Sequence, residues 1–248
     1  MKIAIVGGTG TLGRPVAEEL SSRGHGVRVL SRRSQEYRVD LVTGEGLEAG
    51  LKGCDVVVDA TNSASASARK SARTLVGGSR RLLAAEEAAG VGHHVCVSIV
   101  GCDRMPMGYY RVKTEQERVV EQGRVPWTIV RATQFHGFVA SGFAAAARWG
   151  VIPVPKGRLQ TVAVEEVARA VAGVAERPPR RDRVEVAGPV IGEVGDLARA
   201  WRTSAGKRPL LLPVPLPGGF GRAFRSGAAT SAHPDVRGTV SFEDWLKG

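Results

Sequence analysis

The sequence contains few cysteines and no long apolar run, and each shortage excludes a class of protein. Cys54, Cys96 and Cys102 are too few and too irregularly spaced for a disulfide framework or a zinc site, so we expect no metal. No apolar run approaches the roughly 20 residues that a membrane-spanning helix needs. The first residues predict a core strand rather than a signal peptide. We therefore expect a cytoplasmic protein that does not bind a membrane.

The chain has an excess of basic residues. It carries 35 Lys and Arg against 24 Asp and Glu, a formal net charge of +11, and such an excess is typical of proteins that bind polyanions. The basic residues are scattered in pairs such as Arg80-Arg81 and Arg180-Arg181, without a block of five or six like charges or a nucleic-acid-binding motif. We expect no specific nucleic-acid binding, and we expect part of the charge to serve an anionic cofactor.

An apolar segment over residues 3–6 leads into three glycines at three-residue spacing, Gly7, Gly10 and Gly13, and then into a helical segment. In a nucleotide-binding strand–turn–helix unit, such glycines make a tight turn, let the backbone approach a pyrophosphate and let the helix pack on the strand. The free N–H groups and the positive end of the helix dipole hold the phosphates. A plain glycine-rich turn is the alternative, but this context favours dinucleotide binding.

The second expected strand, residues 27–30, ends in Ser31, Arg32 and Arg33. Proteins that prefer NAD usually have an acidic residue here, which accepts hydrogen bonds from the ribose 2′-hydroxyl. Guanidinium groups instead suit a 2′-phosphate, which a carboxylate would repel. A solvated basic turn is the alternative, but the position predicts NADP(H) as the cofactor.

Expected strands and helices alternate through the first 150 residues, as a parallel sheet requires. The expected strands cover residues 3–6, 27–30, 38–41, 55–60, 94–100 and 127–131, and the expected helices cover 14–20, 47–51, 74–89, 107–122 and 134–149. The alternating serines and alanines of residues 63–68 predict a mobile loop or a frayed helix start.

The regular alternation ends after Gly150. Later segments predict a helix over 162–177, a strand over 184–189, a helix over 193–204, an extended segment over 210–215 and a capped closing helix over 241–246. We expect an α/β fold, a Rossmann-like doubly wound parallel sheet. Residues 1–150 would form the NADP-binding core, and residues 151–248 a small substrate-facing C-terminal part integrated with it in a single domain.

Tyr109 and Lys113 lie four residues apart on an expected helix and therefore share one face. A nearby ammonium lowers the pKa of a tyrosine from its ordinary value of about 10, so we expect Tyr109 to exchange a proton with a carbonyl or alcohol oxygen. Ser98 ends the preceding strand, where its hydroxyl could hold the same oxygen. The Tyr-x-x-x-Lys pattern is common by chance, but its place after that strand favours a catalytic role.

Four segments of the sequence together carry a resemblance to a known family. They are Gly7-Gly8-Thr9-Gly10-Thr11-Leu12-Gly13, Val97-Ser98-Ile99-Val100-Gly101, Gly108-Tyr109-Tyr110-Arg111-Val112-Lys113-Thr114-Glu115-Gln116-Glu117 and Val130-Arg131-Ala132-Thr133-Gln134-Phe135. Through them the chain resembles an atypical short-chain dehydrogenase/reductase of the NmrA-like, NAD(P)H-binding type. The resemblance covers the first 140 residues closely and the rest more loosely.

The resemblance implies roles for individual residues. The implied cofactor-binding residues are Gly7, Thr9, Gly10, Thr11, Leu12 and Gly13 at the pyrophosphate, Ser31, Arg32 and Arg33 at the 2′-phosphate, Asp40 and Leu41 at the adenine, and Ala60, Thr61, Asn62 and Lys113 at the nicotinamide side. The implied pocket wall consists of Thr133, Gln134, Phe135 and His136. His136 would shape the pocket or act as an auxiliary acid or base.

These expectations favour an NADP(H)-dependent oxidoreductase that moves hydride to or from a small carbonyl, enone or quinone-like substrate, with Tyr109, Lys113 and Ser98 as catalytic residues. The interval from Ser98 to Tyr109 is short beside that of dehydrogenases with a secure Ser-Tyr-Lys arrangement, and NmrA-like relatives include nucleotide sensors without turnover. A non-catalytic NADP(H) sensor that binds a protein partner, and an epimerase or dehydratase that retains its cofactor, therefore stay open. We expect a monomer or a homodimer.

The three cysteines are expected to have no catalytic task. Cys54 abuts an expected strand and Cys96 lies inside one, so both are interpreted as small core residues. Cys102 lies in a loop near the candidate active site, where it would be a passive or an oxidisable thiol.

Overall fold

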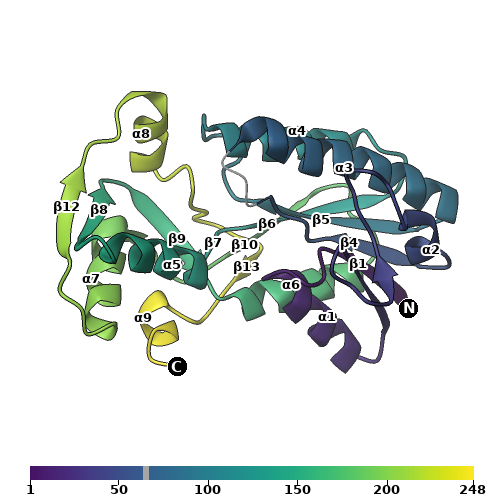
Figure 1. Ribbon diagram of the computed structural model, residues 1–248, viewed down its shortest axis with the longest axis horizontal. Coiled ribbons are helices and arrows are strands. Elements are labelled where there is room, and N and C mark those ends of the chain that lie inside the picture. Colours follow the sequence, from purple (N-terminus) through teal and green to yellow (C-terminus); the bar gives the residue numbers. More distant parts are fainter. Residues whose placement is uncertain (64–66) are drawn as a thin grey trace.

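An eight-stranded sheet forms the centre of the molecule (Figure 1). The computed structural model describes residues 1–63 and 67–248, and within these ranges neighbouring strands of this sheet pair in parallel. In spatial order the strands are β13 (Val236–Arg237), β10 (Arg183–Ala187), β6 (Trp127–Ala132), β5 (His93–Ile99), β4 (Val56–Asp59), β1 (Lys2–Val6), β2 (Gly26–Ser31) and β3 (Tyr37–Arg38).

The strand order reverses between β1 and β4. From β1 the chain proceeds outward through β2 and β3, and it then continues on the other side of β1 through β4, β5 and β6. In doubly wound sheets ligands bind outside the carboxyl ends of the strands at this point. Ile3, Val57 and Val58 are fully buried, as strands covered on both faces require. The Rossmann-like fold predicted from the sequence is confirmed.

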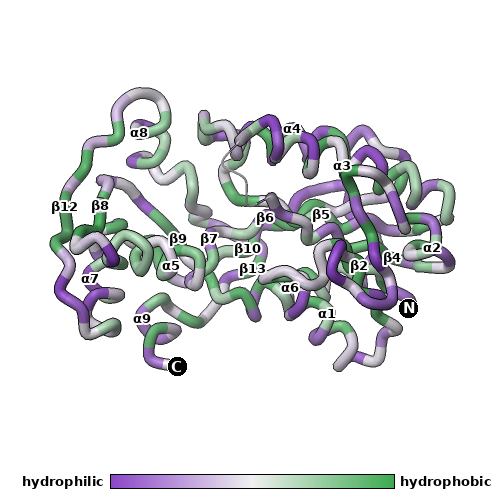
Figure 2. The backbone as a smooth tube through the Cα atoms, in the orientation of Figure 1, coloured by the Kyte–Doolittle hydropathy of each residue, from purple (hydrophilic) through white to green (hydrophobic). Residues whose placement is uncertain are grey.

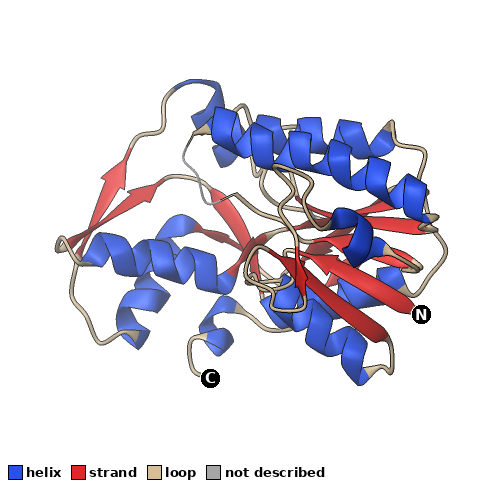
Figure 3. Cartoon of the chain, turned by 45° about the vertical axis from the view of Figure 1, so that its right-hand side comes forward, coloured by secondary structure: helices blue, strands red, loops and turns tan. Residues whose placement is uncertain are grey.

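Helices cover both faces of the sheet (Figures 1 and 3). The helices on one face are α2 (Leu47–Leu51), α3 (Ala68–Ala89) and α4 (Gly108–Glu121), and those on the other are α1 (Gly13–Ser22) and α6 (Val164–Ala175). Each face of the sheet buries its own apolar cluster between strands and helices. Figure 2 shows hydrophobic residues along the central strands and hydrophilic residues along parts of the covering helices. In the described part of the chain, no helix is both long and apolar enough to cross a membrane.

A smaller lobe lies beyond the carboxyl ends of the strands, at the left of Figure 1. Its elements are β7 (Gln134–Phe135), α5 (His136–Ala147), β8 (Val151–Pro155), β9 (Arg158–Val162), β11 (Ile191–Glu193), α7 (Val194–Ser204), β12 (Leu210–Val214), α8 (Gly218–Arg225) and α9 (Phe242–Trp245). Phe143, Trp201 and Phe224 belong to its core. The chain returns to the main sheet for α6, β10 and β13, and the boundary at residue 150 stays a prediction.

Two expected elements differ in the structure because of contacts that the local pattern does not contain. The strand expected over 38–41 is limited to Tyr37–Arg38, since the Asp40 carboxylate accepts a hydrogen bond from the Val42 N–H at 2.7 Å and turns the chain. Gln134 was expected in a helix but lies in β7, because it pairs with Thr161 of β9.

Helix α3 begins six residues before its expected start. Ser67 caps it by accepting a hydrogen bond from the Lys70 N–H. Within the loop or frayed start expected over 63–68, residues 64–66 lie outside the described residues. The capped closing helix is confirmed, with the Ser241 hydroxyl accepting from the Asp244 N–H.

Gly188 is a junction between the two parts of the molecule, and its replacement tests their packing. A Cβ on Gly188 would overlap the Thr161 carbonyl group, with its carbon 2.7 Å away, whereas a Cβ on Gly173 in α6 would meet nothing within 4 Å. We predict that Gly188→Ala lowers the free energy of unfolding by about 1–3 kcal/mol through overpacking. Gly173→Ala should raise it by about 0.5–1 kcal/mol, because alanine favours helix. Urea denaturation of both variants measures these changes. Equal changes in the free energy of unfolding would contradict the predicted overlap at Gly188.

Candidate cofactor and active site

The turn between β1 and α1 consists of backbone contacts that leave no room for side chains. Gly7 has φ +77°, and a Cβ there would lie 2.9 Å from the Ala60 carbonyl oxygen at the end of β4. A Cβ on Gly13 would overlap the Gly7 carbonyl oxygen. The Gly10 N–H donates to that same oxygen at 2.8 Å. Only glycine allows β1, β4 and α1 to meet this closely.

This turn fits a dinucleotide pyrophosphate. Residues 9–11 are exposed, and α1 begins at Gly13 without a side-chain cap among the described residues. The backbone N–H groups at the start of a helix, together with its dipole, attract phosphate oxygens. Leu12 is buried and anchors the turn in the core. The sequence-predicted residues of the turn therefore lie together at the carboxyl ends of β1 and β4.

The two candidate arginines lie beside this turn. The Gly7 N–H donates to the Leu30 carbonyl oxygen of β2 at 2.9 Å, which brings the end of β2 to the glycines. The Ser31 hydroxyl accepts from the Arg33 N–H at 3.0 Å. Arg32 and Arg33 are exposed, so their guanidinium groups are available to a phosphate at this edge.

The expected adenine side is formed by a turn rather than a strand. The Asp40 carboxylate is used within that turn, as described above. Leu41 is buried. A Cβ added at Gly78 of α3 would lie 3.1 Å from the Leu41 side chain, so the two are in close contact. The loop is thereby held against α3.

The residues after β4 lie next to the turn at the same edge of the sheet. Asp59 is fully buried, and its carboxylate accepts hydrogen bonds from the Thr61 N–H at 3.0 Å and the Thr61 hydroxyl at 2.5 Å. Ala60 and Thr61 are half-buried, and Asn62 is exposed. A buried carboxylate thus fixes the segment that the sequence predicted beside the nicotinamide.

Tyr109 reaches this segment from α4. Its hydroxyl donates to the Asn62 side-chain oxygen at 2.6 Å. Burial raises the pKa of Tyr109 to about 12. The prediction that Lys113 lowers this pKa is wrong, because the lysine makes other contacts.

Lys113 points into the protein interior. It is 3% exposed, and its ammonium donates to the Val97 carbonyl oxygen at 2.8 Å and to the Gln116 side-chain oxygen at 2.5 Å. The Gln116 amide in turn donates to Asp59 and to the Ser79 hydroxyl. Lys113 therefore supports the end of β4 through Gln116, and its contact with a nicotinamide ribose stays a prediction.

Ser98 and Tyr109 have different partners. Ser98 is buried, and its oxygen lies 3.9 Å from the sulfur of Cys102. The Cys102 thiol donates to Glu117 at 3.2 Å. Burial and the Glu117 carboxylate raise the pKa of Cys102 to about 11, so the thiol is protonated at neutral pH. Among the described residues, the hydroxyls of Ser98 and Tyr109 share no hydrogen-bond partner.

A buried ion pair anchors this group. Arg131 of β6 donates to both oxygens of Glu117 in α4, at 2.9 and 2.6 Å. Burial, the largest single effect, would raise the pKa of Glu117, but the hydrogen bonds from Arg131, Ser98 and Cys102 and the charge of Arg131 together outweigh it and lower the pKa. The pair joins α4 to the sheet directly behind Ser98.

The four expected pocket residues divide into two pairs. Gln134 and Phe135 are half-buried, and the Gln134 amide donates to the Tyr110 hydroxyl at 3.4 Å. The Gln134 side-chain oxygen is buried without a hydrogen-bond partner among the described residues. Such an atom fits a ligand that donates a hydrogen bond.

Thr133 and His136 have structural contacts instead. Thr133 is buried, and its hydroxyl accepts from the Gly188 N–H at 3.4 Å. His136 is 1% exposed, bonded to the Thr161 hydroxyl at 2.8 Å and to the Val240 carbonyl oxygen at 3.1 Å. Burial lowers its pKa. With both ring nitrogens bonded, His136 holds the C-terminal segment, and its role in the pocket stays a prediction.

Sequence reasoning missed three residues of the site. Tyr110 stands beside Tyr109 with the rings 6.4 Å apart and edge to face. Gln116 and Glu117 are buried on the inner face of α4. Their helical spacing from Lys113 was a usable signal, because residues three and four apart lie on one face.

Comparisons with known proteins agree with this geometry. A family model described as NAD(P)H-binding matches residues 7–178. The fold is similar to that of an NADPH-dependent quinone oxidoreductase from Escherichia coli, with a TM-score of 0.79 and 18% identity over 99% of this chain and 98% of that chain.

Two curated relatives match part of their own length. The chain is 30% identical over 185 residues to the (4-alkanoyl-5-oxo-2,5-dihydrofuran-3-yl)methyl phosphate reductase of Streptomyces griseus subsp. griseus, which covers 70% of this chain and 61% of that protein. It is 28% identical over 148 residues to the Photosystem II assembly factor Ycf39 of Trieres chinensis, which covers 55% of this chain and 46% of that protein. The chain thus spans less than two thirds of the length of either relative.

The Arg131–Glu117 pair gives a stability prediction. Arg131→Met leaves the Glu117 carboxylate buried without its main partner and should lower the free energy of unfolding by about 3–5 kcal/mol. Arg124→Met is the matched control, because the Arg124 side chain is 84% exposed and pairs with Glu87 at the surface. This variant should lower the free energy of unfolding by less than about 1 kcal/mol. Urea denaturation at pH 7 measures both.

The same variants have an expected pH dependence. The pKa of Glu117 is lowered in the folded protein, so its stabilising effect is present above pH 4.5 and is lost as the pH falls through the lowered value. The difference between wild type and Arg131→Met should therefore shrink on acidification. A difference independent of pH, or equal losses in the two variants, would contradict the role of the pair.

Proposed function

Because the chain belongs to the NAD(P)H-binding family, we propose that it is an NADPH-dependent reductase of a small carbonyl, enone or quinone-like compound. The observation that carries the proposal is the protonated phenol of Tyr109 at the carboxyl edge of the sheet, beside Asn62. The relative named as a reductase of an unsaturated oxo-dihydrofuran phosphate supports the same substrate class.

The proposed cofactor site lies along the carboxyl ends of β1, β2 and β4. Residues 9–12 would hold the pyrophosphate, Arg32 and Arg33 the 2′-phosphate, and Asn62 the nicotinamide side. The glycine cradle and the exposed arginines support this placement. NADPH, when bound, supplies hydride to the substrate.

Tyr109 is the proposed proton donor. Its hydroxyl would exchange the bond to Asn62 for one to the substrate oxygen and then donate its proton there. A raised pKa keeps the phenol protonated, which suits reduction better than removal of a proton from an alcohol. Gln134, whose side-chain oxygen has no described partner, would orient a donor group of the bound ligand. Lys113 and Gln116 would hold Asp59 and the nicotinamide-side segment in place.

The preference for NADPH is tested by removing the two guanidinium groups. Arg32→Ala/Arg33→Ala should weaken NADPH binding by roughly 10- to 100-fold, because each charge-assisted contact to phosphate is worth about 1.5–3 kcal/mol before solvent screening. Binding of NADH should change less than about threefold. Isothermal titration calorimetry measures both constants.

Arg23→Ala is the control for total charge, because Arg23 pairs with Glu19 and Glu176 away from the turn. It should leave the affinity for NADPH unchanged. Equal weakening of NADPH and NADH in the double variant would contradict the 2′-phosphate contact.

The proton donor is tested with Tyr109→Phe. We predict a fall in kcat of about 10²- to 10⁴-fold with an unchanged Kd for NADPH, measured on a panel of enones and quinones. Tyr37→Phe, on β3 beneath Arg28, is the matched control and should keep full activity. Full activity in Tyr109→Phe would overturn the assignment.

The pH profile gives an independent check. Since the pKa of Tyr109 is about 12, its acid form persists through pH 10, and kcat for reduction should stay flat from pH 7 to pH 10. A loss of half the rate near pH 10 would indicate a tyrosine with an ordinary pKa.

A second candidate function is a non-catalytic NADP(H) sensor that binds a protein partner. The observations that favour it are the inward direction of Lys113, the separate partners of Ser98 and Tyr109, and the similarity to a protein named as an assembly factor. A sensor should show unequal shifts in melting temperature with NADPH and NADP⁺ and consume no NADPH with any substrate. Turnover that Tyr109→Phe abolishes would exclude it.

A further inference from the structure

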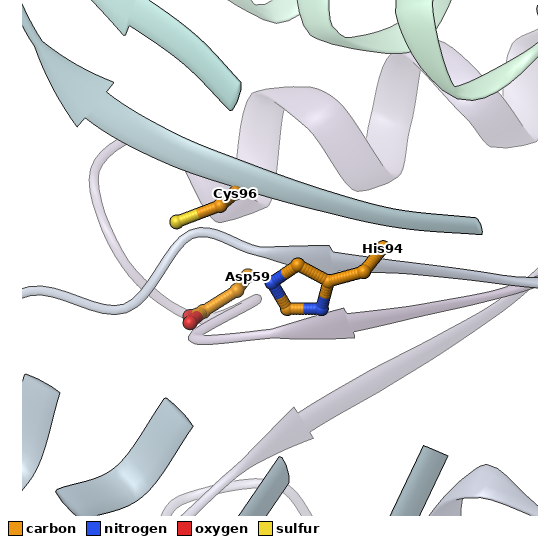
Figure 4. A group of neighbouring side chains, drawn as sticks. All are labelled: Asp59, His94 and Cys96. Carbon is orange, nitrogen blue, oxygen red and sulfur yellow. The ribbon is translucent and has the colours of Figure 1, made fainter. Parts of the chain in front are cut away.

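Three potential metal ligands converge beneath the candidate active site. Asp59 ends β4, and His94 and Cys96 lie on one face of β5 because alternate residues of a strand share a face. Asp59 pairs with Cys96 in the register of the two strands. Their ligand atoms lie within 4.8 Å of one another, and all three residues are fully buried (Figure 4).

The His94 ring is held as a metal-bound histidine commonly is. Its Nδ1 is bonded to both oxygens of the buried Glu86 carboxylate, at 2.8 and 2.9 Å. This bond fixes the orientation of the ring and leaves Nε2 as the nitrogen that can bind a metal once it has given up its proton. Nε2 has no hydrogen-bond partner within residues 1–63 and 67–248. Figure 4 shows a ring nitrogen directed toward Asp59 and Cys96.

We propose that Asp59, His94 and Cys96 bind one zinc-like divalent cation. Thiolate, imidazole and carboxylate are all zinc ligands. One carboxylate and one thiolate balance the two positive charges of the ion. On binding, the Cys96 thiol and His94 Nε2 each give up a proton to solvent as the metal–sulfur and metal–nitrogen bonds form.

The geometry requires only small movements. Zinc ligands lie about 2.0–2.3 Å from the ion, so shifts of about an ångström would bring the three ligand atoms around one centre. The second oxygen of Asp59 supplies a fourth ligand atom. Ser79 and Gln116, which donate to that carboxylate at 3.2 Å, would then orient it as the outer contacts of metal ligands do.

The ion would act as a structural clamp. It would tie the end of β4 to β5 at the point where Asp59 holds Thr61. Because the site is closed to solvent, the chain would acquire the ion as it folds. The irregular spacing of the cysteines predicted no metal, but the ligands are brought together by strand pairing and not by spacing along the chain.

The test is to refold the full-length chain with Co²⁺, which substitutes for zinc and absorbs visible light. We expect one cobalt per chain by mass spectrometry after removal of free ion, with a thiolate-to-cobalt absorption band. Refolding with Zn²⁺ should raise the melting temperature by about 5 °C or more. Cys96→Ser should lose the band, whereas Cys54→Ser, a buried cysteine outside the cluster, should keep it.

The proposal would be overturned if the refolded wild-type chain held no cobalt, or if Cys96→Ser kept the absorption band. His94 and Cys96 would then be an imidazole–thiol pair without a metal. Should Cys96→Ser fail to fold, Asp59→Asn tests the same cluster, and loss of stoichiometric cobalt in that variant is expected. None of these outcomes depends on reductase activity.

Discussion

The close approach of three backbone segments at Gly7 and Gly13 is the constraint on which the rest of the structure depends. A side chain at either position would overlap a carbonyl group of the neighbouring segment. With glycine there, β1 passes directly into α1, and the ends of β2 and β4 reach the same turn. The segments that carry the arginines after β2 and the asparagine after β4 begin beside this turn because it is tight.

A buried polar layer supports the end of β4 and helix α4. One branch runs from Lys113 through Gln116 to Asp59, and the other joins Arg131 to Glu117. Buried polar groups are stable only when they are bonded, so these branches fix α4 against the sheet. Asn62, an exposed group that would meet a ligand, thus follows a segment that the buried Asp59 carboxylate holds in place. The unpartnered nitrogen of His94 lies in the same layer.

Much of the architecture could be predicted because its signals are local. The glycine turn, the alternation of strands and helices, and the shared face of Tyr109 and Lys113 follow from spacing along the chain. The family match confirms the nicotinamide dinucleotide predicted from that turn. The strands β8 and β12 pair although they lie far apart in the sequence. The sequence therefore predicted the extended segment of β12 but neither β8 nor the pairing. The direction of the pKa shift of Tyr109 depends on burial and on the partners of Lys113, which no local pattern records.

The central claim is that this turn and the neighbouring arginines bind a nicotinamide dinucleotide with a 2′-phosphate. Calorimetric titration of the ligand-free wild-type protein with NADPH and with NADH tests it most directly. The account predicts one nucleotide per chain and tighter binding of NADPH. The absence of heat with either nucleotide, or tighter binding of NADH, would contradict it.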